Sequence, residues 1–326
     1  MISRRVFLKG WALGMTALTS KSVLNTNLFA ATEAPAGIQV PYSTGRNRPL
    51  LHVPANACDC HHHIYDPVRF SYTPDDTRNQ PPATVDVYKL LQRRLGTSRD
   101  VMIQPSAYGT DNGCLLDALK QMGSRARGVA VVDRTVTDAE LDRMHEAGVR
   151  GIRFNIATGA ASDEAMILEL SRRVAALGWH TAFWMTADDT VHMADLLNKL
   201  PSTIVFDHRG HIPQPDGIMH PAFKVICNLL DKGRTWVKLS GLYQDSKTGE
   251  PGYADTVKVG QAYVKHAPDR MVWGSDWPHP SEFSSRKPMP NDATMLDLLA
   301  EQAPDESVRT KILVTNPAAL FGFPQS

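Results

Sequence analysis

Three histidines and one aspartate stand at positions from which they could act on one substrate. His61 and His63 are separated by a single residue, whereas His208 and Asp276 belong to two much later β-rich stretches. A carboxylate beside imidazoles can take a proton from water while the imidazoles donate hydrogen bonds to a substrate. We therefore predict that Asp276 is a general base and that the three histidines polarise a carbonyl group and supply protons. A purely structural role would not explain a histidine pair at this spacing together with the two later residues.

Other polar residues at the ends of the predicted strands are candidates for substrate binding. They are Gln104, Tyr108, Arg153, Asn155 and Tyr243. Arg153 offers a fixed cation for a substrate carboxylate or for a developing oxyanion. A salt bridge from Arg153 to a neighbouring strand is the alternative. For Gln104 and Tyr108, contact with substrate and a structural role remain equally open.

The elements that must position these residues alternate in a regular way after residue 56. Strands are predicted at residues 57–64, 100–104, 128–133, 149–155, 179–185, 203–208, 235–240 and 270–276. Stretches of helical period lie between them, for example at 138–147 and 164–177. Repeats of about 30 residues match βα units, and strands that are apolar on both faces are typical of buried parallel sheets. We predict a single-domain (β/α)8 TIM barrel. An open doubly wound sheet is less favoured, because no G-x-G-x-x-G sequence follows any strand.

A barrel would gather the candidate residues at one end, because the catalytic groups of this fold lie at the carboxyl ends of the strands. Side chains in a strand alternate between its two faces. On that basis Asp59, His61 and His63 are expected on one face, and His62 on the other.

Composition excludes several classes of protein. The 326 residues are 42% hydrophobic and 21% charged, which are ordinary values for a globular protein and not for a coiled coil or a disordered chain. Because 35 basic residues balance 34 acidic ones, no broad field favours nucleic acid or an anionic membrane as a partner. Four cysteines are too few for a disulfide framework, and we interpret them as ordinary buried thiols.

The N-terminal segment has the pattern of an export signal. Residues 3–9 read Ser-Arg-Arg-Val-Phe-Leu-Lys, the pattern of a twin-arginine (Tat) signal, and a weakly apolar run follows at 10–18. That run is shorter than the roughly 20 residues that a membrane span needs. We predict a signal peptide and leader at 1–36, an N-terminal extension at 37–56 and the barrel domain at 57–326. The expected partner during export is the Tat translocase, and the expected location is the periplasm or cell envelope, without a membrane anchor in the mature form.

Several motifs together resemble a known family. They are Asp-Cys-His-His-His at 59–63, Gly-Ile-Arg-Phe-Asn at 151–155, Phe-Asp-His at 206–208 and Trp-Gly-Ser-Asp-Trp-Pro-His at 273–279. The sequence resembles the amidohydrolase-related TIM-barrel family, in the branch that contains 2-pyrone-4,6-dicarboxylate lactonase and D-galactarolactone isomerase. The resemblance implies a small-molecule lactone or carboxylate substrate and a hydrolase that acts on a cyclic ester. Because Asp276 could act as a base where the isomerase branch carries an amide, hydrolysis is favoured over isomerisation.

Whether a metal takes part depends on the ligands available. His61, His63 and Asp276 could supply three ligands to one Zn²⁺ and leave a fourth position open. Related two-metal hydrolases also supply a lysine or acid from strand four and a histidine from the end of strand five, and this sequence has Arg153 and Asn155 at the first place and no histidine at the second. The resemblance to the lactonase branch therefore implies that no cofactor is required, with one Zn²⁺ as the alternative.

Three classes of function remain open from the sequence. The first is a lactonase that opens a sugar-acid or dicarboxylate lactone with base-activated water. The second is a zinc-dependent decarboxylase or amide hydrolase on the same barrel, with a lactone isomerase as a further variant. The third is a non-catalytic sugar-acid binder, which would not need an unpaired base beside three histidines.

Overall fold

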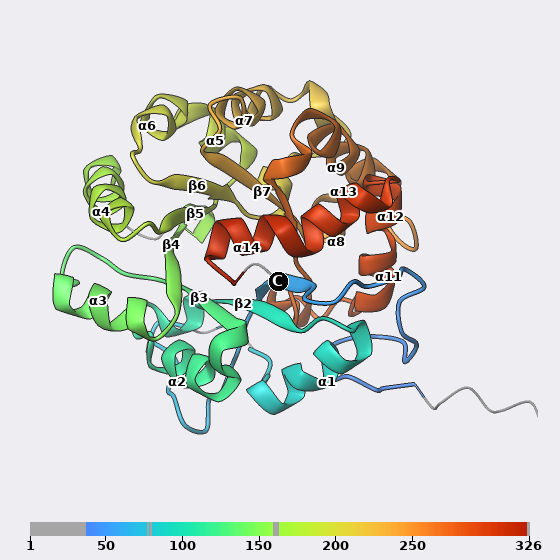
Figure 1. Ribbon diagram of the computed structural model, residues 1–326, viewed down its shortest axis with the longest axis horizontal. Helices are drawn as coiled ribbons and strands as arrows, with labels where there is room; N and C mark the ends of the chain where they lie inside the picture. Colours follow the sequence, from blue (N-terminus) through green and yellow to red (C-terminus); the bar gives the residue numbers. More distant parts are fainter. Residues whose placement is uncertain (1–36, 77, 79, 159–162, 325–326) are drawn as a thin grey trace, which may run out of the picture. The chain divides into compact units, whose positions relative to one another are not determined.

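Eight parallel strands follow one another in chain order around a barrel, and the helices surround them (Figure 1). The structure is a computed structural model that describes residues 37–76, 78, 80–158 and 163–324. The strands are β1 (Cys58–His62), β2 (Arg99–Ile103), β3 (Ala126–Ala130), β4 (Val149–Asn155), β5 (His180–Trp184), β6 (Thr203–Phe206), β7 (Thr235–Leu239) and β8 (Met271–Trp273). All eight predicted strands are present with ends shifted by a few residues, and the predicted (β/α)8 fold is confirmed.

The helices lie in the connections between strands and after the last strand. They are α1 (Val85–Leu95), α2 (Gly113–Met122), α3 (Asp138–Glu146), α4 (Glu164–Ala176), α5 (Ala187–His192), α6 (Ala194–Lys199), α7 (Pro221–Leu230), α8 (Leu242–Asp245), α9 (Ala254–His266), α10 (Pro280–Ser284), α11 (Asp292–Asp297), α12 (Leu299–Gln302), α13 (Glu306–Thr310) and α14 (Asn316–Phe321). Short 3₁₀ turns η1 (Ser106–Tyr108), η3 (Ile156–Thr158) and η4 (His208–His211) follow β2, β4 and β6.

Helix α4 illustrates how the sequence pattern forms these elements. The side chain of Asp163 accepts a hydrogen bond from the Met166 N–H and so caps the first turn. The buried residues of α4 include Met166, Ile167, Leu170 and Val174, which recur at the spacing of one helical face. The same apolar period that predicted this helix therefore also fixes which side packs on the barrel.

Main-chain hydrogen bonds close the barrel between its first and last strands. The Asp276 N–H donates to the His61 carbonyl oxygen at 2.7 Å, and the His63 N–H donates to the Trp277 carbonyl oxygen at 2.8 Å. Both bonds lie at the carboxyl ends of β1 and β8. The barrel thus closes through the same residues that carry the candidate chemistry.

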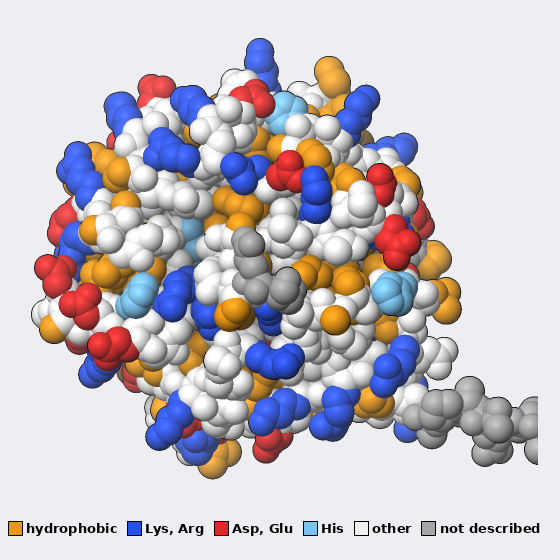
Figure 2. All heavy atoms as spheres, in the orientation of Figure 1, with side chains coloured by type: hydrophobic (Ala, Val, Ile, Leu, Met, Phe, Trp, Pro, Cys, Tyr) orange, Lys and Arg blue, Asp and Glu red, His pale blue; other side chains and the backbone are white. Residues whose placement is uncertain are grey.

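The C-terminal segment packs against the opposite end of the barrel. Phe321 and Phe323 pack in one cluster with barrel-interior residues such as Val101 and Val129. Figure 1 shows α14 crossing the centre of the strands in this view. Figure 2 shows the same face covered by side chains of both charges, as the balanced composition predicts. The site described below lies at the other end of the strands.

The N-terminal extension packs on the barrel domain. The Trp277 indole N–H donates to the Pro41 carbonyl oxygen at 2.9 Å, and the guanidinium of Arg94 in α1 donates to the Thr44 carbonyl oxygen at 2.7 Å. Tyr42 makes an edge contact with Phe283 in α10. The extension therefore supports the segment that follows β8.

Two smaller predictions concern cysteines and membranes. Cys58, Cys60 and Cys114 are free and buried as predicted, whereas Cys227 is free but partly exposed, which corrects the expectation that all four are buried. Among the described residues, the helices include none that is both long and apolar enough to cross a bilayer. The predicted signal at 1–36 lies outside the described residues and stays a prediction.

Candidate active site

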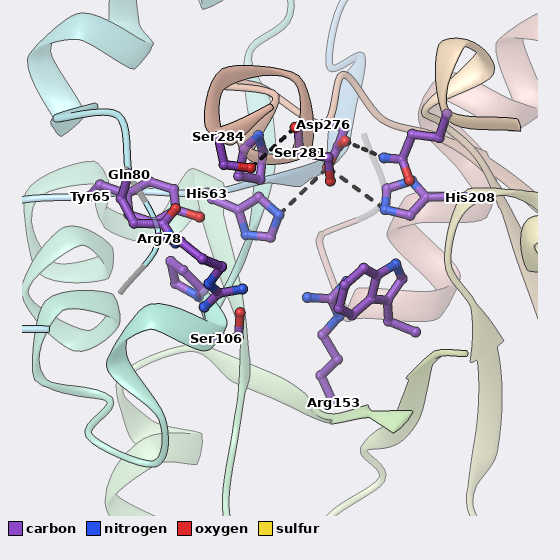
Figure 3. A pocket seen from close by; sticks show the side chains of 14 residues that line it. His63, Tyr65, Arg78, Gln80, Ser106, Arg153, His208, Asp276, Ser281 and Ser284 are labelled. Atoms are coloured by element: carbon purple, nitrogen blue, oxygen red, sulfur yellow. Dashed lines mark hydrogen bonds and ion pairs between the residues drawn. The ribbon is translucent and has the colours of Figure 1, made fainter. Parts of the chain in front are cut away.

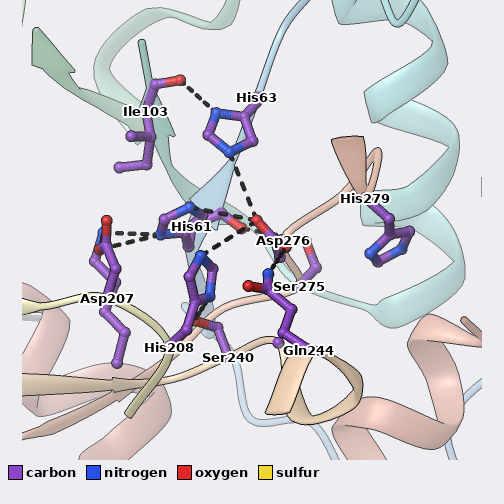
Figure 4. A network of polar contacts seen from close by, with 12 residues as sticks. His61, His63, Ile103, Asp207, His208, Ser240, Gln244, Ser275, Asp276 and His279 are labelled. Atoms are coloured by element: carbon purple, nitrogen blue, oxygen red, sulfur yellow. Dashed lines mark hydrogen bonds and ion pairs between the residues drawn. The ribbon is translucent and has the colours of Figure 1, made fainter. Parts of the chain in front are cut away.

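One oxygen of Asp276 lies at the centre of the predicted catalytic residues. Asp276 Oδ1 is 3.4 Å from His61 Nε2, 3.5 Å from His63 Nε2 and 3.7 Å from His208 Nε2 (Figure 4). All four side chains are buried. The barrel thus brings together His61 in β1 with three residues that follow β1, β6 and β8, a grouping that the sequence predicted.

The other oxygen of Asp276 is held by two donors from the segment after β7. The Tyr243 hydroxyl donates to Oδ2 at 2.6 Å, and the Gln244 amide donates to the same oxygen at 2.7 Å. Asp276 has a φ of +63°, an unfavourable conformation for a residue with a side chain. Such backbone strain is common at functional sites, where the surrounding structure enforces one geometry.

The electrostatic surroundings keep Asp276 ionised. Burial alone would raise the pKa of Asp276, but the adjacent His208 and His61 hold it well below its usual range. Burial, together with the charge on Lys238, lowers the pKa of His61 to about 3. The site therefore pairs a carboxylate with a neutral His61 imidazole at neutral pH.

This pairing makes a prediction for the pH dependence of the reaction. A base with a lowered pKa is active above that pKa and becomes inactive as the pH falls through it, so Asp276 should cause no change in kcat/KM between about pH 5 and 8. Burial and the nearby charge of Asp276 also raise the pKa of Glu282 in α10 to about 7. Because Glu282 and Asp276 interact, ionisation of Glu282 is expected to produce an inflection in the rate near pH 7. A pH profile of wild type and Glu282→Gln checks both statements, because an inflection near pH 7 should disappear in the variant. An inflection that persists in Glu282→Gln and disappears in Asp276→Asn would contradict the low pKa of Asp276.

A second buried carboxylate, Asp207, organises the cations of the site. Asp207 Oδ2 accepts a hydrogen bond from Arg153 Nε at 2.8 Å, and Oδ1 is 3.0 Å from Lys238 Nζ. Burial would raise the pKa of Asp207, but Lys238 and Arg153 hold it well below its usual range. Arg153 in β4 therefore does form a salt bridge, but its partner Asp207 follows β6, two strands away and not on a neighbouring strand, and Arg153 also lines the cavity of the site.

Lys238 decides which nitrogen of His61 carries the proton. Lys238 Nζ lies 3.1 Å from His61 Nδ1, and both side chains are fully buried. A lysine ammonium can only donate, and its contact is shorter than the 3.4 Å from Nδ1 to Asp207 Oδ1, so we assign His61 Nδ1 as the acceptor and place the ring proton on Nε2. His61 Nε2, which has no hydrogen-bond partner among the described residues, then points its N–H at Asp276, and His61 itself lies behind the residues that line the cavity.

In His63 the roles of the two ring nitrogens are reversed. Its Nδ1 lies 2.8 Å from the carbonyl oxygen of Ile103, and a carbonyl oxygen can only accept. In the neutral ring Nε2 is therefore an acceptor, and it faces Asp276 Oδ1. Two acceptors at this distance suit a water molecule that donates to both. The neighbouring histidines of the H-x-H pair thus have different capacities, one as a donor and one as an acceptor.

The structure corrects the predicted orientation of Asp59. Its carboxylate accepts hydrogen bonds from the Ser275 hydroxyl at 2.6 Å and from the Tyr88 hydroxyl at 3.1 Å. Tyr88 in α1 also stacks on His62, so Asp59 and His62 share the face turned away from the site. A register irregularity between Asp59 and His62 breaks the simple alternation, and His61 still turns inward.

Gly274 allows β8 to lie directly against β1 beneath this site. A Cβ atom at position 274 would lie 2.6 Å from His61 Cβ and 2.8 Å from the His61 backbone nitrogen. Any side chain there would push His61 away from Asp276. The glycine of the Trp-Gly-Ser-Asp motif is thus required by close packing.

The cavity of the site opens in front of Asp276. It is lined by His63, Tyr65, Arg78, Gln80, Pro105, Ser106, Arg153, Trp184, His208, Gln244, Asp276, Pro280, Ser281 and Ser284. Figure 3 shows Arg78 and Arg153 approaching this space from different elements. Each arginine also pairs with a carboxylate, Arg78 with Asp76 and Arg153 with Asp207. The two cations suit a substrate that carries negative charge.

The other predicted substrate-binding residues lie around the cavity lining. Tyr243 contacts Asp276 and thus positions the carboxylate. The Gln104 amide donates to the Asp111 carbonyl oxygen, and the Tyr108 hydroxyl accepts from the Asp66 N–H. Asn155 is buried at the end of β4. None of these four is among the described residues that line the cavity, and their contact with substrate stays a prediction.

Sequence reasoning did not select several residues that the structure places in the site. Lys238 and Asp207 stand at the ends of predicted strands, and this position could have identified them as candidate site residues. Gln244 directly follows the selected Tyr243. Arg78 and Trp184 offered no comparable signal, because only the folded chain brings the segment before α1 and the end of β5 to the same cavity.

Comparison with known proteins identifies the family. A profile described as amidohydrolase matches residues 58–323, which is most of the chain. The chain belongs to the amidohydrolase family. This amidohydrolase is 34% identical over 288 residues to a 2-pyrone-4,6-dicarboxylate hydrolase from Comamonas testosteroni, covering 84% of this chain and 93% of that protein. It is 31% identical over 270 residues to a D-galactarolactone isomerase from Agrobacterium fabrum, covering 82% and 91%. The resemblance predicted from the motifs is confirmed.

A solved structure supports the same assignment. A crystal structure from Agrobacterium tumefaciens superposes on this amidohydrolase with a TM-score of 0.78 at 30% identity, covering 85% of this chain and all of that one. The likeness covers the barrel that carries the site. The structural comparison therefore supports both the predicted barrel fold and the predicted family.

The distances in the site also bear on a metal ion. Single ligand atoms of His61, His208 and Asp276 all lie within 4.8 Å of one another, so the distances alone would admit a metal. This set contains His208 in place of His63, unlike the set expected from the sequence. However, a metal needs a lone pair on His61 Nε2, and the contact with Lys238 places a proton there. To join this ligand set His61 would have to adopt its other tautomer, with Nδ1–H directed at Asp207 Oδ1, which lies 3.4 Å away.

Proposed function

We propose that this protein is a lactonase that opens its substrate with water activated by Asp276. The observation that carries the proposal is the single carboxylate oxygen surrounded by three imidazole nitrogens at 3.4, 3.5 and 3.7 Å. The relative from Comamonas testosteroni is a hydrolase of a pyrone dicarboxylate, which supports a cyclic ester as the substrate class. The two arginines that line the cavity favour a lactone of a sugar acid or of a dicarboxylate.

The reaction follows from the positions of the donors and acceptors. Asp276 and His63 accept hydrogen bonds from one water molecule, and Asp276 takes a proton as the water oxygen attacks the lactone carbonyl carbon. His61 donates its Nε2 proton as a hydrogen bond to the oxyanion that forms. When the ring C–O bond breaks, the proton on Asp276 passes to the departing alkoxide. The products are the open hydroxy acid and the regenerated carboxylate.

We propose that this reaction needs no metal ion. The contact between Lys238 and His61 supports this, because a His61 protonated on Nε2 serves the oxyanion directly. The alternative is a single zinc ion in a hydrolase or decarboxylase on the same barrel, for which the approach of His61, His208 and Asp276 is the supporting observation.

A screen of the purified protein against lactones tests the proposed function. Sugar-acid lactones and 2-pyrone-4,6-dicarboxylate should release acid that a pH indicator detects, and the rate should be unchanged after chelator treatment. Metal analysis of the same sample provides an independent measurement. Activity that disappears with chelator and returns with Zn²⁺ would overturn the metal-free mechanism. Absence of hydrolysis for every lactone would overturn the function.

Lactone isomerisation is the second candidate, because one relative is a D-galactarolactone isomerase. A hydroxyl group of the substrate would then replace water as the nucleophile at the carbonyl carbon. Reaction in H₂¹⁸O distinguishes the two functions. Hydrolysis places ¹⁸O in the product carboxylate, whereas isomerisation gives an unlabelled lactone and releases no acid.

We also propose export by the Tat translocase to the periplasm or cell envelope, on the basis of residues 3–9. Replacing Arg4 and Arg5 together by lysine should keep the protein in the cytoplasm, since the arginine pair is the recognised feature. Cell fractionation followed by immunoblotting measures this. Replacing Lys9 by arginine keeps the pair and the charge, and it should leave delivery unchanged. Normal delivery of the double lysine variant would contradict the proposal.

A further inference from the structure

A second cavity lies beside the catalytic one and shares a wall with it. The catalytic cavity has a volume of about 70 Å³, and the second one has a volume of about 290 Å³. Trp184, at the end of β5, is the residue common to both. The second cavity is lined by Ala157, Trp184, Met185, Thr186, Ala187, Asp188, His211, Pro213, His220 and Asp245. The larger space at this end of the barrel is thus next to the reacting groups and is not used by the mechanism above.

The turn η4 connects the two cavities. His208, at its start, lies against Asp276, whereas His211, at its end, lines the second cavity. All four residues of this turn have positive φ, and three of them are not glycine, namely His208 at 47°, Arg209 at 57° and His211 at 49°. Because each is unfavourable for a residue with a side chain, the surrounding fold must maintain this turn. The turn therefore sets the positions of two imidazoles, that of His208 in the catalytic cavity and that of His211 in the second cavity.

The polar groups of the second cavity are arranged as acid and imidazole pairs. His211 Nδ1 lies 3.1 Å from Asp245 Oδ1, and His220 Nε2 lies 3.5 Å from Asp188 Oδ1. His211 Nε2 is buried and has no hydrogen-bond partner among the described residues. A buried imidazole nitrogen without a partner is costly unless a ligand or water satisfies it.

The two cavities differ in charge. Arg78 and Arg153 line the catalytic cavity, whereas the described residues that line the second cavity include no lysine or arginine. The second cavity combines the indole of Trp184 and the apolar Met185 and Pro213 with two carboxylates. One of these, Asp245, also lies 3.6 Å from the buried Arg209, which does not line the cavity. A flat apolar surface beside hydroxyl-binding carboxylates suits an uncharged ring that carries hydroxyl groups, and it disfavours an anion.

We propose that the second cavity is a subsite for a neutral sugar ring attached to the lactone, so that the substrate is the lactone of a glycosylated sugar acid. The charged or lactone end occupies the catalytic cavity, and the sugar ring stacks on Trp184 with its hydroxyls on the Asp245 and Asp188 pairs. This inference rests on the proposed lactonase function, and it adds the part of the substrate that lies beyond the reacting ring.

A pair of lactones of different length tests the subsite. Cellobionolactone carries a neutral glucose ring that gluconolactone lacks. Wild type should hydrolyse cellobionolactone with a kcat/KM at least about 10-fold higher, since a well-placed set of contacts commonly contributes a factor of this order. Ala187→Trp, which fills the second cavity, should lower the ratio of the two kcat/KM values by about 10-fold. His211→Ala should lower the same ratio through loss of a polar contact and serves as a second variant if Ala187→Trp fails to fold.

The matched control is Ala176→Trp at the exposed end of α4, which should leave both rates unchanged. Equal kcat/KM values for the two lactones in wild type would overturn the subsite, as would an unchanged ratio in folded variants. If wild type hydrolyses neither of these two lactones, calorimetry with cellobiose decides the subsite, and the proposed function fails only if the wider lactone screen also shows no hydrolysis. Binding that is lost in Ala187→Trp would support it, and absence of binding to wild type would overturn it.

Discussion

Replacing Asp276 by asparagine is expected to lower kcat by about 10² to 10⁴, the usual contribution of a general base. The amide has nearly the same shape and can still accept hydrogen bonds from Tyr243 and Gln244, but it cannot take a proton from water. The value of KM should therefore change little. Steady-state kinetics with the lactone identified in the screen measure both constants, and thermal unfolding shows whether the variant is folded.

Asp100→Asn is the matched control for this substitution. Asp100 is also a fully buried carboxylate beside a histidine, with Oδ2 at 3.1 Å from His62 Nε2, but it lies in β2 under helix α1, away from the cavity. Burial raises the pKa of Asp100 to about 8, so its neutral form already prevails near pH 7 and resembles the amide. This control should keep nearly full activity. Full hydrolytic activity in Asp276→Asn would refute the assignment of the base.

Replacing Lys238 by methionine is expected to destabilise the fold by about 3–5 kcal/mol, because it leaves the buried Asp207 with one cationic partner fewer. The same change should lower kcat by about 10²-fold, since His61 loses the donor that keeps its proton on Nε2. Without Lys238, His61 Nδ1 can donate to Asp207 Oδ1, which lies 3.4 Å away, and His61 Nε2 becomes free to bind a metal. Zinc content after dialysis against Zn²⁺ should therefore be higher than in wild type.

Urea unfolding, steady-state kinetics and metal analysis measure the three effects separately. Lys311→Met is the control for the loss of an ion pair, because Lys311 lies 2.8 Å from Asp269 on the exposed surface. An exposed pair of this kind contributes about 0–1 kcal/mol, so the control should be nearly neutral. If Lys238→Met loses no activity and gains no zinc, Lys238 does not control the tautomer of His61.

The sequence by itself determined the fold and which candidate site residues the fold would bring together. The β-rich and helical periods recur at the length of a βα unit, and this local regularity located all eight strands. Once the barrel is known, the ends of its strands must meet, so His61, His63, His208 and Asp276 could be grouped without coordinates. The same reasoning placed Arg153 at the cavity.

Only the tertiary structure decided how those residues are oriented and protonated. The register irregularity in β1 turns Asp59 to the outer face, although strict alternation predicts the inner one. Lys238 reaches His61 across 177 positions of the chain, and Ile103 binds His63 from another strand. These contacts assign one histidine as a donor and the other as an acceptor. A one-dimensional pattern records which face a residue is expected to take, whereas the tautomer of an imidazole depends on the partner that packing brings within hydrogen-bond distance.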